Sequence, residues 1–274
     1  MSVINTNTSA LFAQNALSAN ARVMSKAMEQ LSTGKRINSA GDDAAGLAIG
    51  ESMTAQVRGL NQAVRNANDG INMLQTAEGA MVEQSNMLQR MRELAVQSNN
   101  GTLSTTQQGY LQTEFNALTT QIATIASSTT WNGMGVTVNT SVKFQIGVNS
   151  GDTFTVALSS TSSATGALSI TGIAISTTSS STAASAAITT IDSAIDYINN
   201  VRATIGASIN RLTYAADNLM NVSQNVQASR SSIVDTDYAT ASTQLSKSQI
   251  VQQAATAMLA QANQQPQSVL ALLK

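Results

Sequence analysis

The chain has 274 residues, of which 42% are apolar, only 3% are aromatic and 11% are charged. The lack of Cys and His excludes disulfides, Cys- or His-dependent nucleophilic catalysis, and zinc sites with Cys or His ligands. A net charge of −1 gives no broad electrostatic footprint for nucleic acid. We therefore expect a protein that is not an enzyme and needs no cofactor or metal. The sparse charge favours self-association.

The N-terminus lacks a basic start followed by an apolar core, and no stretch of about 20 apolar residues occurs. The sequence therefore predicts neither a Sec signal peptide nor a membrane span. Two locations stay open at this point, namely the cytosol or export through a dedicated apparatus.

The first segment, about 9–34, has apolar residues at steps of three and four, which indicates a helix. Gly34 is expected to cap its C-terminus. Asp42 or Asp43 is expected to cap the following helix, and a cation site at these carboxylates is a minor alternative. The expected stripe of the first helix is Ala10, Ala13, Leu17, Ala21, Met24, Met28 and Leu31.

Residues 43–99 contain no proline and read as one helix of roughly 80 Å. An apolar stripe runs along its first part and broadens beyond Leu74. The stripe consists of Met53, Val57, Leu60, Val64, Ala67, Ile71 and Leu74. The broadened face adds Met73, Ala77, Ala80, Met87, Met91 and Leu94. A stripe of this length requires other long helices to cover it.

After a turn at 99–101, Ser104 is expected to cap a second helix over about 105–127 that folds back on the first. From about 131 to 175 the apolar period changes to two, and the NSGD turn at 149–152 predicts a β-hairpin. The segment 168–175 is expected to add another strand. Ser/Thr-rich stretches beside it are interpreted as loops, with O-linked modification as an open alternative.

A long helical pattern returns over about 183–232, and it is close in length to the first rod. After a break at 234–237, a last helix is expected over about 238–265, where Pro266 stops or bends it. Its expected seam is Val251, Ala255, Met258 and Ala262. Because both terminal helices have narrow Ala- and Met-rich stripes, we expect them to be largely disordered in the free subunit and to order against neighbouring subunits.

The expected fold class is mainly α, a long antiparallel coiled-coil-like helical bundle with a small central β-hairpin region and with paired N- and C-terminal helices. We expect residues 1–42 with 234–274 to form one part, the terminal helices. Residues 43–233 form the other part, the rods, with a β-rich insert at 131–182.

Several long strings resemble bacterial flagellin, over about 1–135 and 185–274. They include MSVINTNTSAL, LSTGKRINSAGDDAAGLAI, RGLNQAVRNANDGINMLQTAEGA, LQRMRELAVQS, RSSIVDTDYATAS and QQAATAMLAQANQQPQSVLALL. The resemblance implies an extracellular, secreted subunit of the flagellar filament that serves motility. It also implies export in unfolded form by the flagellar type III apparatus. The short centre implies a minimal flagellin without large outer domains.

The resemblance further implies an inner tube made of the terminal helices and a surrounding layer made of the rods. Expected partners are copies of the chain itself, an export chaperone, the filament cap, hook–filament junction proteins and a Toll-like receptor. A junction protein, or another coiled-coil type III secreted structural protein, is the alternative identity. A soluble helical enzyme or ligand-binding protein is disfavoured because no site for either is visible.

Three groups of residues are expected to carry these functions. Subunit packing is assigned to Val57, Leu60, Val64, Ile71, Leu74, Met87, Leu94, Ile198, Ile205, Leu212, Leu219 and Met258. By resemblance, receptor recognition is assigned to Arg90, Leu94 and Glu114. Chaperone binding is assigned to Ile250, Met258, Val269, Leu270 and Leu273. The broadened face from Met73 to Leu94 is the expected contact with the next subunit.

Overall fold

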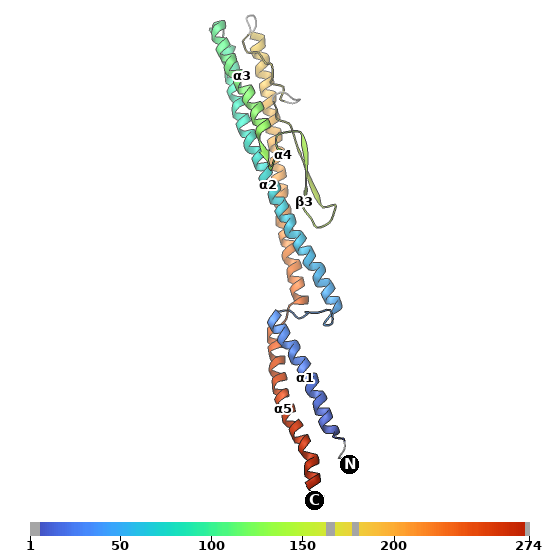
Figure 1. Ribbon diagram of the computed structural model, residues 1–274. Coiled ribbons are helices and arrows are strands. Elements are labelled where there is room, and N and C mark those ends of the chain that lie inside the picture. The colour runs from blue at the N-terminus through green and yellow to red at the C-terminus, as the bar shows by residue number, and fades with distance from the viewer. Residues whose placement is uncertain (1–5, 163–167, 177–180, 272–274) are drawn as a thin grey trace. The chain divides into compact units, whose positions relative to one another are not determined.

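The computed structural model describes residues 6–162, 168–176 and 181–271, and the side chains of 181–182 and 265–271 lie outside the description. The chain divides into two compact units. We call Met1–Val57 with Gln224–Lys274 the terminal unit, and Arg58–Ser223 the rod unit. Figure 1 shows the chain from blue at its N-terminus to red at its C-terminus.

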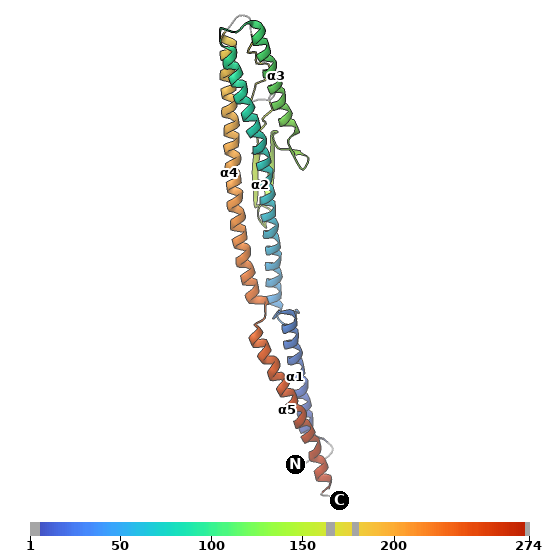
Figure 2. The ribbon, with the colours of Figure 1, turned by 90° about the vertical axis from the view of Figure 1, so that its left-hand side faces the viewer.

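The terminal unit is built on an antiparallel pair of helices, α1 (Thr8–Thr33) and α5 (Tyr238–Ala271). They lie side by side in Figures 1 and 2. Asn7 Oδ1 accepts a hydrogen bond from Ala10 N at the start of α1, and Gly34, at φ 70°, ends the helix. The predicted cap at Gly34 is therefore confirmed. Helix α5 continues through Pro266, so the expectation that this proline stops the helix is wrong.

The segments that follow α1 and precede α5 pair as a short antiparallel bridge. Arg36 N donates to Val234 O at 2.7 Å, and Thr236 N donates to Gly34 O at 3.0 Å. Lys35 and Asp235 form the isolated bridge between these two stretches. The two hydrogen bonds each join positions more than 190 residues apart in the chain, and together they set the register in which the two segments meet.

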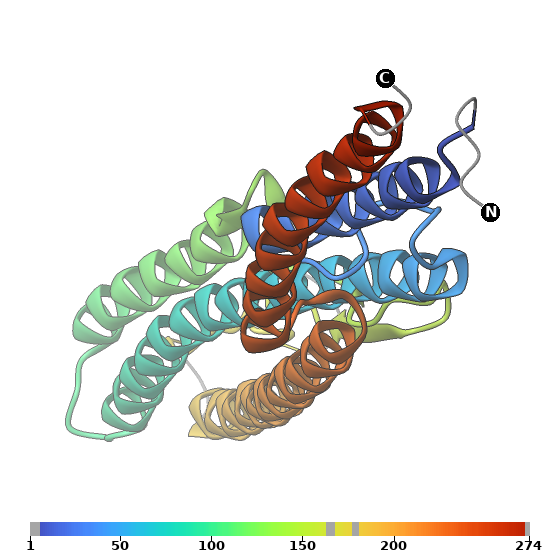
Figure 3. The ribbon, with the colours of Figure 1, turned by 90° about the horizontal axis from the view of Figure 1, so that it is seen from below.

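Three helices build the rod unit, namely α2 (Ala44–Ser98) from Arg58 onward, α3 (Thr105–Ser128), and α4 (Ser181–Val234) up to Ser223. Helix α2 lies between α3 and α4, as Figures 2 and 3 show. Both α3 and α4 run antiparallel to α2 (Figure 1). Ser104 and Gln107 form the capping box of α3, so the predicted cap is confirmed. The mainly α architecture predicted from the sequence is confirmed.

The predicted hairpin is present as β3 (Thr140–Gln145) and β4 (Thr153–Leu158), which pair antiparallel with Phe144 opposite Phe154. Phe154, Val156 and Leu158 face the core because alternate residues of a strand share one face. A smaller pair, β1 (Thr130–Trp131) and β2 (Met134–Gly135), was not predicted. Its turn residues Asn132 and Gly133 have φ 48° and 79°, the positive values typical of an Asn-Gly hairpin turn.

The segment 168–176 forms no strand, contrary to the sequence prediction. It buries Leu168 and Ile170, and side chains supply hydrogen-bond partners to its backbone at Ile173 and Ile175. Gln112 Oε1 accepts from Ile175 N at 2.6 Å, and Gln112 Nε2 donates to Ile173 O at 3.1 Å. An amide side chain therefore takes the place that a neighbouring strand would occupy, and the segment stays irregular.

Candidate functional site: surfaces for subunit contact

Helices α1 and α5 meet along stripes that combine Ala, Leu, Met and polar residues at steps of three and four, as in a coiled coil. The stripe of α1 is Ala10, Ala13, Leu17, Asn20, Met24, Ala27 and Leu31. The stripe of α5 is Ala241, Leu245, Ser248, Gln252, Ala255, Leu259 and Ala262. Asn7 Nδ2 donates to Ala262 O and Asn20 Nδ2 donates to Ser248 O, both at 2.8 Å. Side-chain amides thus fasten α1 to the backbone of α5.

The seam predicted for α5 is one residue out of position at two of its four members. Ala255 and Ala262 face α1, whereas Val251 and Met258 are exposed. Met258 therefore lies outside the seam of the terminal unit. The observed stripe includes Ser248 and Gln252. Because these residues are polar, the spacing of apolar residues did not predict them. In α1, likewise, Met28 is exposed and the neighbouring Ala27 is buried.

Several large apolar side chains of the pair point away from its seam. Phe12 is 79% exposed and Met258 is 66% exposed, and Leu11 and Ile250 are also exposed. Phe12 and Met258 line one open groove of about 500 Å³ between the two helices. The groove is lined by Thr8, Ser9, Phe12, Ala13, Ala16, Ala255, Met258 and Ala262. This apolar surface, which we call the α1/α5 groove, is suited to contact with another apolar surface.

The rod unit has the opposite arrangement, with large side chains inside. Leu60 and Leu219 pack in a small cluster, and Leu74, Ile198, Ile205 and Leu212 belong to one large core. Val64, Ile71 and Met87 are half-buried against these clusters. The seam of α2 is therefore covered by α4, as the spacing predicted.

The broadened face of α2 is covered within the same chain. Met73, Met91 and Leu94 are fully buried in a core that also contains Phe115 of α3 and Ile170 of the irregular segment. The expectation that this face contacts the next subunit is therefore wrong for these side chains. Periodicity identified an apolar face, but the cover comes from α3 and from residues 168–175, whose placement depends on tertiary contacts.

The three residues assigned to receptor recognition do not share one surface. Arg90 Nε lies 2.9 Å from Glu114 Oε1 and joins α2 to α3, and Arg90 also pairs with Glu93 at 3.0 Å. The hydrogen bonds that Arg90 donates, first to Glu114 and then to Glu93, raise the pKa of its guanidinium, which stays charged. Leu94 has 0% exposure. Arg90 and Glu114 are thus available at the surface, and the Leu94 side chain is not.

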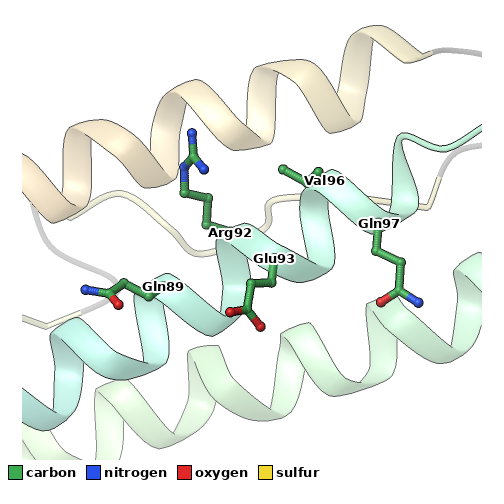
Figure 4. A pocket seen from close by; sticks show the side chains of 5 residues that line it. All are labelled: Gln89, Arg92, Glu93, Val96 and Gln97. Atoms are coloured by element: carbon green, nitrogen blue, oxygen red, sulfur yellow. The ribbon is translucent and has the colours of Figure 1, made fainter.

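A shallow groove on α2 lies beside this ion pair, between α3 and α4 (Figure 4). It measures about 530 Å³ and is lined by Gln89, Arg92, Glu93, Val96 and Gln97. In Figure 4 the Arg92 side chain points toward α4, where its Nε lies 2.6 Å from Asp192 Oδ1. Val96 is half-exposed and is the apolar residue of this lining. The groove has no enclosed interior, so it is suited to contact with a macromolecular surface rather than with a small molecule.

Of the residues assigned to chaperone binding, Ile250 and Met258 are exposed on α5. The side chains of Val269, Leu270 and Leu273 lie outside the described part of the chain.

The two adjacent aspartates have local roles. Asp43 Oδ1 accepts from Gly46 N at 2.9 Å and so caps α2. Asp42 pairs with Lys26 at 2.9 Å and accepts hydrogen bonds from the backbone of Ser39 and Asn38, and these partners hold the pKa of its carboxyl well below its usual range. Within the described residues, His, Cys, Asp and Glu form no group of three that could hold a metal ion.

In the part of the chain that the structure describes, none of the helices combines the length and the apolar content needed to cross a bilayer.

Comparison with known proteins places these surfaces in a family. Residues 4–140 match the bacterial flagellin N-terminal helical region, and residues 188–273 match the bacterial flagellin C-terminal helical region. The chain is 45% identical to a flagellin of Halalkalibacterium halodurans, over 99% of this chain and 100% of that protein. It is 42% identical to the flagellar filament 33 kDa core protein of Treponema phagedenis, over 99% of this chain and 100% of that protein.

Among solved structures, the crystal structure of Bacillus cereus flagellin shares 33% identity and covers 57% of this chain and 88% of that one, with a TM-score of 0.49. The family predicted from the sequence is confirmed, and so is its short form, because the Halalkalibacterium halodurans match spans 275 residues and includes that whole protein. The chain belongs to the bacterial flagellin family and is a structural subunit of the extracellular flagellar filament.

Proposed function

We propose that this flagellin polymerises through the α1/α5 groove, with residues 1–42 and 234–274 forming the inner layer of the filament and residues 43–233 the layer around it. The observation that carries the proposal is the outward position of Phe12 and Met258, which line an open apolar groove and lie outside the seam of their own helix pair. In a free subunit this apolar area faces water, and a second copy of the chain would remove it from water.

The energetics of the helix pair favour the same proposal. Only Ala27, Ala241 and Ser248 are fully buried along the two facing stripes. A pair with so little buried apolar area is marginal by itself, because burial must offset about 1–2 kcal/mol of backbone entropy per ordered residue. Burying an exposed Phe12 contributes roughly 1.5–3 kcal/mol. Assembly therefore stabilises the terminal helices by mass action.

Marginal terminal helices also suit export. We propose that the chain passes unfolded through the flagellar type III apparatus and that a chaperone holds the C-terminal helix beforehand, with Ile250 and Met258 among its contacts. The exposed apolar side chains of α5 support this because they need cover before assembly. The cap and the hook–filament junction proteins are proposed as partners at the two ends of the filament.

Recognition of the depolymerised subunit by a Toll-like receptor is proposed to use Arg90 and Glu114 and to leave the Leu94 side chain in the core. The half-exposed ion pair and the adjoining shallow groove support a protein contact at this place. Leu94 then supports the surface from below by packing in the core that joins α2 to α3.

The test of the polymerisation proposal compares Phe12→Ser with Gln14→Ser in the full chain. Both residues are exposed on α1, but Gln14 does not line the groove. Seeded assembly is followed by sedimentation and electron microscopy, which give the critical concentration and the presence of filaments. We expect Phe12→Ser to raise the critical concentration by about tenfold to a hundredfold and Gln14→Ser to change it by less than about threefold.

Unchanged assembly of Phe12→Ser would contradict the assignment of the groove. Trp131 fluorescence during urea unfolding serves as the folding control, because this single Trp lies in the rod unit against its core.

A further inference from the structure

The side chains most easily oxidised in this chain are methionines. The sequence has 11 Met, one Trp, and neither Cys nor His. Met73, Met81 and Met91 are fully buried in the rod core, whereas Met28, Met134, Met220 and Met258 are exposed. Because oxidation follows solvent access, a mild oxidant reaches the second group first.

Met258 differs from the other exposed methionines in its surroundings. It has the largest exposure of the four, 66%, and it is the one that lines the α1/α5 groove. Phe12 lies on the same groove from the opposite helix, and most of the remaining lining consists of Ala side chains. Met134 and Met220 belong to the rod unit, at the β1–β2 hairpin and on α4.

We propose that Met258 is a site of reversible oxidation by peroxide-class oxidants, and that its sulfoxide blocks addition of the subunit to the filament. The inference rests on the proposed contact through the α1/α5 groove. Met258 is open to the oxidant in the free subunit and covered once a second copy occupies the groove. Oxidation therefore acts on unassembled subunits and spares those already in a filament.

The chemical step is a two-electron oxygen transfer. A lone pair of the Met258 sulfur attacks one oxygen of hydrogen peroxide, the O–O bond breaks and an S–O bond forms. The departing hydroxide takes up the proton of the transferred oxygen and leaves as water. Sulfur is oxidised by two electrons and the peroxide is reduced by two. Methionine sulfoxide reductases reverse the change, so the modification is a switch rather than damage alone.

The sulfoxide opposes assembly because it is strongly polar. The thioether can be buried against Phe12 and the Ala residues without losing a hydrogen bond. A sulfoxide oxygen at the same place can accept hydrogen bonds from water while the groove is open. Burying this oxygen without a hydrogen-bond donor is unfavourable. Among the described residues that line the groove, Thr8 and Ser9 are the polar ones, and both lie on α1, opposite the helix that carries Met258. The change thus weakens a contact that the reduced side chain makes.

The experiment uses the full-length chain as free subunits, hydrogen peroxide as the oxidant and catalase to end the reaction. Peptide mass spectrometry measures the sulfoxide fraction at each Met, and seeded assembly gives the critical concentration. Met258→Leu is the test variant because Leu conserves the volume, and Met220→Leu is the matched control on an exposed site of the rod unit.

We expect oxidation to raise the critical concentration of the unaltered chain and of Met220→Leu by about tenfold, and that of Met258→Leu by less than about twofold. In preformed filaments we expect Met258 to be oxidised at least about tenfold more slowly than in free subunits. Reductase treatment should restore assembly in step with the loss of the Met258 sulfoxide. This reversal tests the inference even if Met258→Leu assembles poorly.

Oxidised Met258→Leu that loses assembly as fully as the unaltered chain would overturn the inference, because the responsible site would then lie elsewhere. Normal assembly of unaltered chain with complete Met258 conversion would overturn it as well. Neither result contradicts the proposed function if Phe12→Ser still raises the critical concentration. Conversely, normal assembly of Phe12→Ser shows that the groove itself was wrongly assigned.

Discussion

Leu74 and Leu60 lie on the same stripe of α2, yet the structure predicts different costs for truncating them. Leu74 has 0% exposure inside the large core, which extends from α2 to α3, the hairpin and α4. Leu60 has 4% exposure in a small cluster with Ala63 and with Leu219, itself 9% exposed. We expect core side chains to enclose the cavity that Leu74→Ala would leave. Some of the few side chains around Leu60 are partly exposed, so they can move to fill the cavity of Leu60→Ala, or water can enter it.

Leu→Ala substitutions in cores cost about 2–5 kcal/mol, and the value rises with the cavity that remains. We therefore expect Leu74→Ala to lower the free energy of unfolding by about 4 kcal/mol and Leu60→Ala by about 2.5 kcal/mol. Helix propensity does not explain either loss, because Ala is the better helix former. With a urea dependence of about 2 kcal/mol per M, the midpoints fall by about 2 M and about 1.2 M.

The assay is equilibrium urea unfolding of the full chain followed by Trp131 fluorescence and far-UV circular dichroism. Trp131 reports on the rod unit because it packs against the large core. A loss at Leu60 equal to or larger than the loss at Leu74 would refute the reasoning. So would losses below about 1 kcal/mol at both positions, since neither residue would then lie in a closed core.

Two further predictions concern helix ends. Ser104→Ala removes the capping box with Gln107 and should cost about 1 kcal/mol, seen as a lower urea midpoint and faster hydrogen exchange in the first turn of α3. Asp42 has a lowered pKa in the folded chain, so its contribution is fully present above the unfolded value of about 3.9 and is lost as pH falls below it. Asp42→Asn should therefore flatten the pH dependence of terminal-unit stability below about pH 4. Hydrogen exchange of α1 measures this stability. An unchanged slope would show that the contact between Asp42 and Lys26 does not persist in solution.

The sequence predicted the interior of the rod unit well because its buried residues are large, apolar and regularly spaced. Steps of three and four along α2 occur only on one face of a helix, so Leu60 and Leu74 had to share a buried side. The step of two from Phe154 to Leu158 identified β4 in the same way. Both patterns are local, and the long helices leave little freedom in how they are covered.

Such patterns could not predict elements whose conformation depends on hydrogen-bond partners elsewhere in the chain. Residues 168–176 have the composition of a strand, but Gln112 and Ser98 satisfy their backbone in place of a neighbouring strand. The residue pattern of α3 does not indicate that role for Gln112. The β1–β2 hairpin was different, because Asn132-Gly133 is a strong turn signal that the sequence did offer.

The observed α5 seam differs from the predicted one at two positions, and the physical cause of this difference also bears on assembly. Asn20 donates a hydrogen bond to the backbone of α5, and the small buried residues Ala27, Ala241 and Ser248 let the two helices approach closely. Leu and Met side chains occupy several of the remaining seam positions, whereas Phe12 and Met258 are turned outward on the surface of the pair. In the rod unit large side chains face inward and its core is complete. In the terminal unit Phe12, Ile250 and Met258 face outward, as we expect for a helix pair whose cover is supplied by further copies of the same chain.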